Sequence, residues 1–492
     1  MRRISGLQCY PSSVSETTKL QVGVFAGGEI SAATGGWLTI ENPFDHTIVG
    51  EAPDGNHEDV DRAVRAAREA FDRGPWPRLT PAERAVWIDR LADEIEARGA
   101  GTADLITAEI GQPISLARGM NAIRPVQHLR YYARMARELH VEQERQNVDR
   151  EGSSLHLRQP LGVAALIVPW NHPQSSTTLK LGPALAAGCT VVIKPAAESP
   201  LDIFNLAAAS QAIGLPPGVI NIVTGGRETG RALVAHPGVD KVAFTGSTAA
   251  GRHIAAAAGQ RLIPATLELG GKSAAIVLDD ADLDQVMTSL RYASFGNTGQ
   301  NCVSLSRILV PAHQHDGVVD RLVELARSLS MGDPKDTATE VGPLVSAVAL
   351  ARVSAMVDRA VAAGATVLAG DTPAPNDGYF YAPRVITGAA ADSEIAQHEI
   401  FGPAITVHAY ADVDEAIRVA NATSYGLGGA VFGADEDAVL AVARRVRTGS
   451  IGINGYRPDL GSPFGGVKDS GLGREFGPEA IENYRESTSI FR

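Results

Sequence analysis

Cysteine is scarce in this sequence: its 492 residues include three, Cys9, Cys189 and Cys302. Three cysteines can form neither a disulfide framework for so long a chain nor a four-thiolate zinc site. So low a count is typical of a reducing compartment. We therefore predict a cytoplasmic protein without a bound metal.

Basic residues and long apolar runs are lacking too. Lys and Arg number 44 against 56 Asp and Glu, so the net charge is −12, which argues against a nucleic-acid-binding surface. The longest apolar runs, such as 161–170, are far shorter than the ~20 residues of a membrane helix. Residues 1–20 are polar and lack the apolar stretch of a signal peptide. We expect a folded, soluble protein with a flexible N-terminal extension and no membrane or nucleic-acid partner.

Several common catalytic motifs are absent from the sequence. The Gly-Lys-Ser at 271–273 has Thr266 where a phosphate-binding loop needs glycine, which excludes the usual ATPase motif. His398 and Glu399 are not followed by the second histidine of a zinc hydrolase, and no Gly-x-Ser-x-Gly elbow occurs. Kinase and hydrolase chemistry are therefore not indicated.

The N-terminal part of the sequence has helical patterns. Asn56 can cap a helix whose apolar residues recur at helical spacing to about residue 71. The segment 80–83, Thr-Pro-Ala-Glu, combines an N-cap, a proline at the first helical position and a capping-box glutamate. These patterns predict a mainly helical region up to about residue 140.

From residue 155 onward, short β-rich runs alternate with helical stretches. The first series of strands is expected at 162–168, 190–194, 219–225 and 242–246. A second series is expected at 266–278, 306–311, 379–386, 404–410 and 428–433. Helix-length connections between strands imply parallel sheets covered on both faces. The fold class is therefore α/β, with a Rossmann-like parallel-sheet domain followed by a second α/β domain.

Polar residues follow several predicted strands. Gly246 and Ser247 lie between a strand and a helix, where free N–H groups suit a pyrophosphate, although a tight turn explains the same residues. Lys194 ends another strand, at the sheet edge where ligands of open α/β folds bind; the alternative is an ordinary surface lysine.

Three further residues have catalytic chemistry. Cys302 lies in a Gly- and Asn-rich segment whose N–H groups would lower its thiol pKa, whereas a lone cysteine is otherwise a small buried hydrophobe. Glu268 ends a strand and is either a half-buried general base or a surface carboxylate. Asn171 follows a strand and either donates to an oxyanion or caps the next helix.

Together, these residues and their surroundings resemble the aldehyde dehydrogenase superfamily over nearly the whole chain after about residue 20. The matching segments are PWNHP at 169–173, VVIKPA at 191–196, FTGSTAAG at 244–251, LELGGKS at 267–273, GQNC at 299–302, EIFGP at 399–403 and SPFGGVKDSGLGRE at 462–475.

The resemblance implies a Cys302 nucleophile, a Glu268 general base and an Asn171 oxyanion donor. The reaction would convert an aldehyde, NAD(P)+ and water into a carboxylic acid and NAD(P)H, through a thiohemiacetal and a thioester on Cys302. One alternative is a coenzyme A-acylating semialdehyde dehydrogenase, against which Glu268 argues because such enzymes need no base for water. The other is a non-catalytic cofactor-binding protein of the same fold, which would need none of the three residues.

For the cofactor, the resemblance implies contacts at the adenosine ribose, the pyrophosphate and the nicotinamide ribose. The residues implied are Lys194, Trp170, Gly246, Ser247, Glu399 and Phe401.

The choice between NAD and NADP depends on one carboxylate. NAD-preferring members often have glutamate three residues after the lysine, but that position is Ala197 here and the glutamate follows it, as Glu198. A carboxylate near the ribose repels a 2′-phosphate. We expect NAD, with NADP as the alternative.

The resemblance also places residues near the aldehyde channel: His172, Ser176, Leu179, Phe295, Val303, Arg457 and Phe464. Few are aromatic, so a caged quaternary ammonium substrate gains no support. Arg457 could bind the carboxylate of a semialdehyde, although an exposed structural arginine is the simpler interpretation.

Four parts of the chain are expected. They are an extension at 1–20, a cofactor domain at 21–140 and 159–267, a catalytic domain at 268–470, and a small β oligomerisation arm at 141–158 and 471–492. The arm follows from the resemblance, and the alternation at 153–159 suits a strand. It implies a homo-oligomer, either a dimer or a homotetramer.

Overall fold

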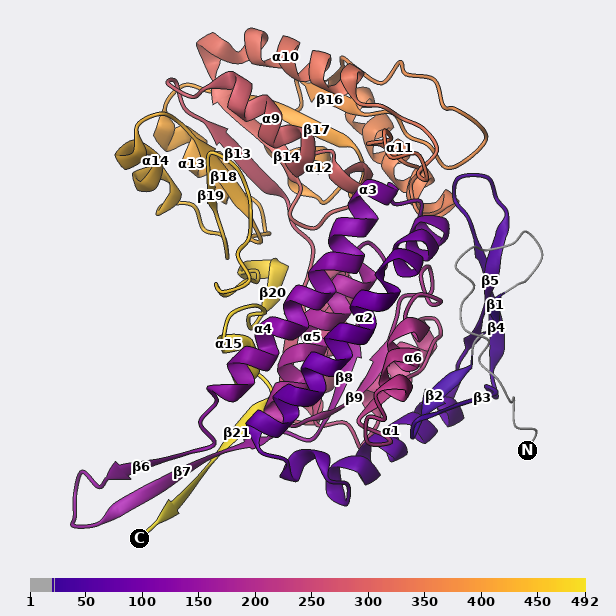
Figure 1. Ribbon diagram of the computed structural model, residues 1–492. Coiled ribbons are helices and arrows are strands. Elements are labelled where there is room, and N and C mark those ends of the chain that lie inside the picture. The colour runs from indigo at the N-terminus through magenta and orange to yellow at the C-terminus, as the bar shows by residue number, and fades with distance from the viewer. Residues whose placement is uncertain (1–19, 22) are drawn as a thin grey trace.

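The computed structural model describes residues 20, 21 and 23–492, so the predicted extension lies, apart from Leu20, outside the described residues. Two large sheets organise the described chain (Figure 1). In the first sheet the strand order is β20-β12-β11-β8-β9-β10-β2-β3, and in the second it is β15-β16-β17-β14-β13-β18-β19. The central strands of both sheets are parallel, as predicted.

The strands of the first sheet are β2 (Val24–Ala26), β3 (Glu29–Ser31), β8 (Val163–Ile167), β9 (Thr190–Lys194), β10 (Ile220–Ile222), β11 (Lys241–Thr245), β12 (Ala265–Glu268) and β20 (Gly471–Leu472). Those of the second sheet are β13 (Ser273–Val277), β14 (Leu305–Pro311), β15 (Thr366–Val367), β16 (Arg384–Thr387), β17 (Ala404–Tyr410), β18 (Gly429–Phe432) and β19 (Gly452–Ile453). A smaller sheet contains β1 (Leu20–Gln21), β4 (Gly36–Glu41) and β5 (Ile48–Asp54).

Helices cover both faces of the first sheet. One face packs against α2 (Pro81–Ile110), α4 (Arg124–Arg137), α5 (Pro173–Ala187) and α6 (Phe204–Ala212). The other packs against α1 (His57–Asp72), α7 (Arg227–Ala235) and α8 (Thr248–Gln260). Alternate side chains of β8 explain both layers, because Ala164 and Leu166 belong to the first cluster and Val163 and Ala165 to the second.

The second sheet is covered in the same way. One face packs against α9 (Leu283–Ala293) and α10 (His315–Ser328), and the other against α13 (Val413–Asn421) and α14 (Glu436–Ala443). The remaining helices are α3 (Ile114–Ala117), α11 (Ala347–Ala362), α12 (Glu394–Gln397) and α15 (Glu479–Glu482).

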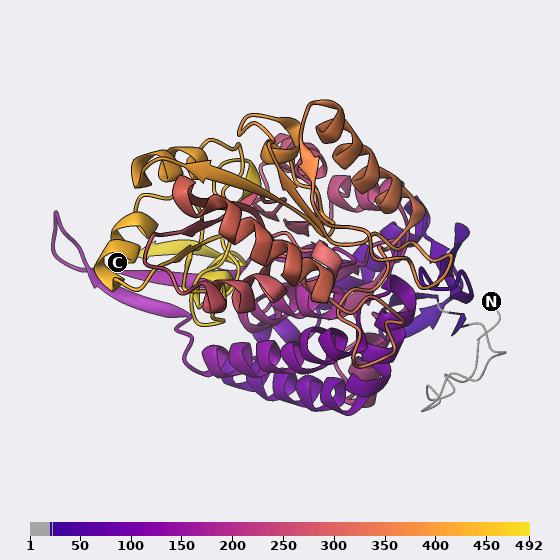
Figure 2. The ribbon, with the colours of Figure 1, turned by 90° about the horizontal axis from the view of Figure 1, so that it is seen from above.

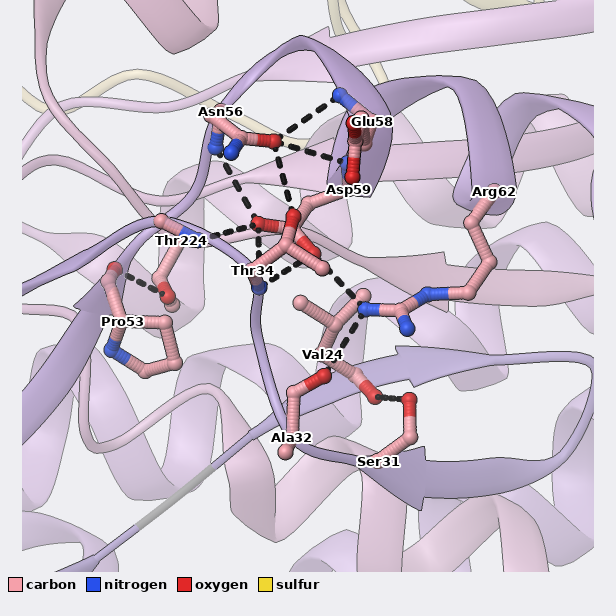
Figure 3. Close-up of polar contacts among 11 residues, drawn as sticks. Val24, Ser31, Ala32, Thr34, Pro53, Asn56, Glu58, Asp59, Arg62 and Thr224 are labelled. Atoms are coloured by element: carbon pink, nitrogen blue, oxygen red, sulfur yellow. Dashed lines mark hydrogen bonds and ion pairs between the residues drawn. The ribbon is translucent and has the colours of Figure 1, made fainter. Parts of the chain in front are cut away.

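The predicted start of α1 is confirmed. The Asn56 side chain accepts from the N–H groups of Glu58 and Asp59, and Asp59 completes the capping box. The Asp59 carboxylate is fully buried, pairs with Arg62 and accepts from the Thr34 N–H (Figure 3). A single carboxylate thus joins the helix start to the chain that follows β3.

Two strand predictions need correction. The run 266–278 is two strands, because Gly270 and Gly271 break it, and β12 joins the first sheet while β13 joins the second. The run 379–386 forms a strand only from Arg384, because Pro383 has no N–H to donate to a ladder.

Three antiparallel strands form a small sheet, called the arm below, in the region where an oligomerisation arm is expected: β6 (Glu142–Gln146), β7 (Ser153–Pro160) and β21 (Arg485–Phe491). The arm projects from the body (Figures 1 and 2). Gly471 and Leu472, expected in the arm, instead form β20, which pairs with β12 at the edge of the first sheet. This pairing satisfies backbone N–H and C=O groups at an edge of β12 that would otherwise be unpaired.

Candidate active site

The carboxyl ends of neighbouring strands bring the predicted site residues together. Strands β9, β8, β11 and β12 are adjacent and parallel, so their last residues lie along one edge. Lys194 ends β9, Asn171 follows β8, Ser247 follows β11 and Glu268 ends β12. Open α/β sheets bind ligands at this edge.

Cys302 lies in the loop between the short helical turn at Gly296–Gly299 and β14. Asn297 and Thr298 have φ of 55° and 56°, left-handed values that are unusual for these residues and are often found at functional sites. A Cβ on Gly271 would lie 2.3 Å from the Cys302 carbonyl oxygen. Only glycine at 271 therefore lets the cysteine loop pack against the end of β12.

The environment of the Cys302 thiol differs from the prediction. Burial raises its pKa to about 12, and the carboxylates of Glu399 and Glu268 add to the increase. The N–H groups of Cys302 and Val303 favour the thiolate, as the sequence suggested, but their effect is smaller. The resting residue is therefore a neutral thiol that needs a base to remove its proton.

Glu268 is more buried than predicted, with 3% of its surface exposed. Neither carboxylate oxygen has a hydrogen-bond partner of normal geometry among the described residues. Burial, and then the charge of Glu475, raise the pKa of Glu268 well above its ordinary value, against the opposing charges of Lys180 and Arg474. An unpartnered carboxyl group with a raised pKa is suited to proton transfer near neutral pH.

An ion pair that sequence analysis missed lies beside this carboxyl group. Lys180 on α5 is fully buried and pairs with Glu475. Its Nζ also donates to Thr245 Oγ1 at 2.6 Å. One signal was available in the sequence, because Lys180 is the only charged residue of α5.

The Asn171 amide faces the cysteine loop. Its Nδ2 donates to the Gln300 carbonyl at 3.0 Å, which leaves its second hydrogen for another acceptor. Asn297 Nδ2 donates to the Asn171 carbonyl at 3.2 Å. The end of β8 is thus bonded in both directions to the segment that precedes Cys302.

From the predicted role of Asn171 as oxyanion donor, we expect Asn171→Ala to lower kcat by about 10²–10³-fold. Steady-state kinetics with a saturating aldehyde would measure this loss. Asn205→Ala is a matched control, because Asn205 is also buried but donates to Thr102 Oγ1 on α2. Equal kcat in the Asn171 variant and the wild type would contradict the role.

The predicted channel residues differ in their surroundings. Leu179 and His172 are buried, and Ser176, Val303 and Phe464 are partly exposed. Phe464 stacks on Phe476 with ring centroids 5.0 Å apart. Phe295 is 1% exposed and packs in the core between α9 and the second sheet. Arg457 is exposed.

Two absences apply to residues 20, 21 and 23–492. No helix in this part of the chain is long and apolar enough to cross a membrane. Nor does any group of three or more His, Cys, Asp or Glu side chains there have a metal-binding arrangement.

A model of the aldehyde dehydrogenase family matches residues 31–490. The chain belongs to the aldehyde dehydrogenase family. It is 46% identical to a geranial dehydrogenase of Castellaniella defragrans, over 95% of this chain and 98% of that protein. A Mycobacterium tuberculosis aldehyde dehydrogenase solved with NAD+ is 38% identical, with a TM-score of 0.94 over 96% of this chain and 99% of that one. An aldehyde dehydrogenase C mutant from Pseudomonas syringae, solved with NAD+ and octanal, is 36% identical, with a TM-score of 0.91 over 95% of this chain and 96% of that one.

The predicted family and α/β fold are thereby confirmed, and the chain is an NAD(P)-dependent oxidoreductase of aldehydes. Its sheet edge fits the cofactor of this aldehyde dehydrogenase family. Lys194 Nζ is buried and donates to the carbonyls of Pro195 and Gly225, both at 2.6 Å, which leaves one ammonium hydrogen for a ligand. Ser247 is exposed and caps α8 by accepting from the Ala250 N–H, so the remaining N-terminal amides of this helix suit a pyrophosphate.

Glu399, Trp170 and Phe401 are the remaining residues predicted to contact the cofactor. Glu399 accepts from the Gly271 N–H at 3.1 Å, and burial raises its pKa to about 7. Trp170 and Phe401 meet edge to face at 5.5 Å, and Phe401 has a left-handed φ of 54°. Such strain in a bulky residue is typical of a functional position.

Proposed function

We propose that this enzyme oxidises an apolar aldehyde to its carboxylic acid with NAD+ and water, with Cys302 as nucleophile, Glu268 as general base and Asn171 as oxyanion donor. The observation that carries these roles is the partly buried Cys302 thiol, whose pKa is raised with the help of two nearby carboxylates, one of which has no hydrogen-bond partner. A scaffold without activity has no need of an unpartnered buried carboxyl group, since burying it is unfavourable for folding.

In the first half of the reaction, Cys302 loses its proton and its Sγ bonds to the aldehyde carbon. Glu399 and Glu268 are the two carboxylates near this thiol, and either of them in its ionised form can accept the proton. The carbonyl oxygen becomes an oxyanion, to which the free hydrogen of Asn171 Nδ2 and the Cys302 N–H donate. A nicotinamide cofactor held at Glu399 and Phe401 would supply the acceptor for the hydride of the carbon attached to Cys302.

In the second half, Glu268 takes a proton from water, which attacks the thioester carbon and releases the acid and the Cys302 thiol. The buried pair of Lys180 and Glu475 lies beside Glu268, and its charges shift the pKa of that base in opposite directions. Glu268 has to release any proton gained in the first half before it acts on water, and these two charges help to set the pKa at which it does so. Because Glu268 provides a base for water, acid rather than an acyl-coenzyme A is the expected product.

For the cofactor we propose Lys194 and Glu198 at the adenosine ribose, Gly246, Ser247 and Trp170 near the pyrophosphate, and Glu399 and Phe401 at the nicotinamide end. Glu198 supports NAD because its charge raises the pKa of Lys194, so the two groups are close. Burial has the larger and opposite effect and lowers that pKa to about 8.

We expect Glu198→Ala to reduce the preference for NAD over NADP by about 5- to 10-fold, since it removes a charge that repels a 2′-phosphate. The ratio of kcat/KM for the two cofactors measures this effect. Glu324→Ala, which removes an exposed carboxylate from α10 on the second sheet, is the control and should leave the ratio unchanged. An unchanged ratio in the Glu198 variant would show that this residue does not select the cofactor.

An apolar substrate is supported by the relatives named for geranial or solved with octanal, and by Leu179, Val303 and Phe464 among the proposed channel residues. The test is NAD reduction without coenzyme A, with geranial, octanal, benzaldehyde and succinic semialdehyde. We expect kcat/KM for geranial to exceed that for the semialdehyde by at least about tenfold. If the enzyme instead prefers the semialdehyde and Arg457→Ala removes that preference, Arg457 binds a substrate carboxylate. No NAD reduction with any of these aldehydes would contradict the proposed function.

We also propose a homo-oligomer, a dimer or a homotetramer, assembled through β6, β7 and β21. Support comes from the exposed apolar residues of this arm, with Ile490 46% and Phe491 69% exposed. A cytoplasmic location is supported by the low cysteine content, and Cys189 and Cys302 are both free thiols.

A further inference from the structure

A chain of buried amides connects the helical layer to the residue that follows β8. Gln112, between α2 and α3, is 1% exposed, and Asn121 is fully buried. The Ser175 N–H donates to Asn121 Oδ1 at 3.4 Å, and Asn121 Nδ2 donates to Gln112 Oε1 at 2.7 Å. Gln112 Nε2 donates to the Asn171 carbonyl at 3.0 Å and lies 3.3 Å from His172 Nδ1.

The direction of these hydrogen bonds assigns the tautomer of His172. A backbone N–H can only donate, so Asn121 presents its oxygen to Ser175 and its nitrogen to Gln112. Gln112 therefore presents its nitrogen to the ring, and His172 Nδ1 must accept. The ring proton then resides on Nε2, a buried atom that has no hydrogen-bond partner among the described residues.

The ring is neutral as well as oriented. Burial lowers the pKa of His172 to about 4, with Arg124 as the charged group that adds to the decrease. The Asn301 side chain opposes this shift, so the ring lies beside the residue that precedes Cys302. The amide chain thus runs from Asn121 and Gln112 to the segment that contains Asn171 and His172.

The Asn171 carbonyl connects the helical layer to the cysteine loop. It accepts from Gln112 on the helical side and from Asn297 in the cysteine loop, at 3.0 Å and 3.2 Å. The segment that contains Gln112 is itself fixed to the second domain, since the Ile114 N–H donates to the Pro334 carbonyl at 2.7 Å. Loss of the Gln112 donor would leave this peptide held only from the side of the cysteine.

We propose that Gln112 and Asn121 are positioning residues of the oxyanion hole, which hold the Asn171 peptide and the Nε2-protonated ring of His172 so that the Asn171 amide points at the aldehyde oxygen. This inference rests on the proposed aldehyde oxidation. Packing alone does not explain the arrangement of Gln112, because both hydrogens of its amide are directed to the Asn171–His172 segment. Asn121 also lies in a π-helical turn, Arg118–Ile123, a geometry frequent at functional sites.

The test uses the full chain and measures the pre-steady-state burst of NADH with a saturating aldehyde, which reports acylation of Cys302. Gln112→Met keeps the length of the side chain and removes both donors. We expect its burst rate to fall by about 10–100-fold, because a small misplacement of a reacting group has an effect of this size. The Kd for NAD+ should stay unchanged.

Gln112→Glu separates positioning from structural support. A protonated glutamate can still donate to His172 Nδ1, whereas an ionised one can donate to nothing. Its burst rate, relative to the wild type at the same pH, should therefore recover as the pH falls, and that of Gln112→Met should not. Absence of this difference would overturn the proposal.

Asn205→Leu is the control for the loss of a buried amide. Asn205 Nδ2 donates to Thr102 Oγ1 on α2 at 2.8 Å, away from the cysteine. It should lower the melting temperature as Gln112→Met does and leave the burst rate unchanged. The proposal is wrong if Gln112→Met keeps a burst rate within about twofold of the wild type, or if Asn205→Leu loses as much. A wild type without any burst would instead contradict the proposed function.

Discussion

Replacing Cys302 by alanine is expected to lower kcat by at least about 10⁴-fold while the Kd for NAD+ remains within about twofold of the wild type, because the variant loses the atom that bonds to the substrate. No other described cysteine can substitute for it. Cys189 is fully buried against the Tyr484 carbonyl, and burial raises its pKa to about 11. NADH formation and fluorescence titration with NAD+ are the two measurements.

Cys189→Ala is the matched control for this result. It removes a fully buried thiol from the core against the first sheet and should leave kcat unchanged within about twofold. Turnover by the Cys302 variant at even about a tenth of the wild-type rate would contradict the nucleophile assignment.

Replacing Glu268 by glutamine is expected to preserve a single burst of NADH and to lower steady-state turnover by about 10²–10⁴-fold, since the thioester then lacks a base for its water. Rapid-mixing absorbance shows the burst, and mass spectrometry of the quenched protein shows acylated Cys302. A variant that turns over at the wild-type rate would contradict the base assignment. Loss of the burst itself would show that Glu268 is required to ionise Cys302.

Glu268 also sets the pH dependence of deacylation. Glu268 acts as a base only when ionised, and its pKa is raised, so wild-type deacylation should increase with pH through a range above that of an ordinary glutamate. Glu268→Gln should lose this increase. Glu486→Gln, in the exposed part of β21, is a control that should keep it.

Much of the architecture is local and was therefore predictable. The caps of α1 and α2, the strand-helix alternation and the two parallel sheets follow from patterns within short windows. The catalytic motifs also have a local signature, because Gly271 is needed wherever the cysteine loop packs against β12. These features depend on neighbours in sequence or on backbone geometry.

What the sequence could not predict depends on residues that are far apart in it. The ionisation of Cys302 depends on burial and on Glu399, which outweigh the N–H groups of its own loop. The pairing of Lys180 with Glu475 joins α5 to the C-terminal region. Gln112 reaches Asn171 from another layer of helices, and no short-range pattern identifies such a contact.

The short strand β20 affects how the chain folds during its synthesis. It pairs with β12, the strand that ends in Glu268, yet it is made long after β12 during synthesis. Domains fold largely from the N-terminus as the ribosome extends them, and pairing between distant segments is slow. In a nascent chain, the edge of β12 beside Glu268 therefore stays unpaired until β20 is made. A chaperone can bind to this edge, or a second chain can add a strand to it. Expression of folded protein should therefore depend on the C-terminal segment that contains Gly471 and Leu472.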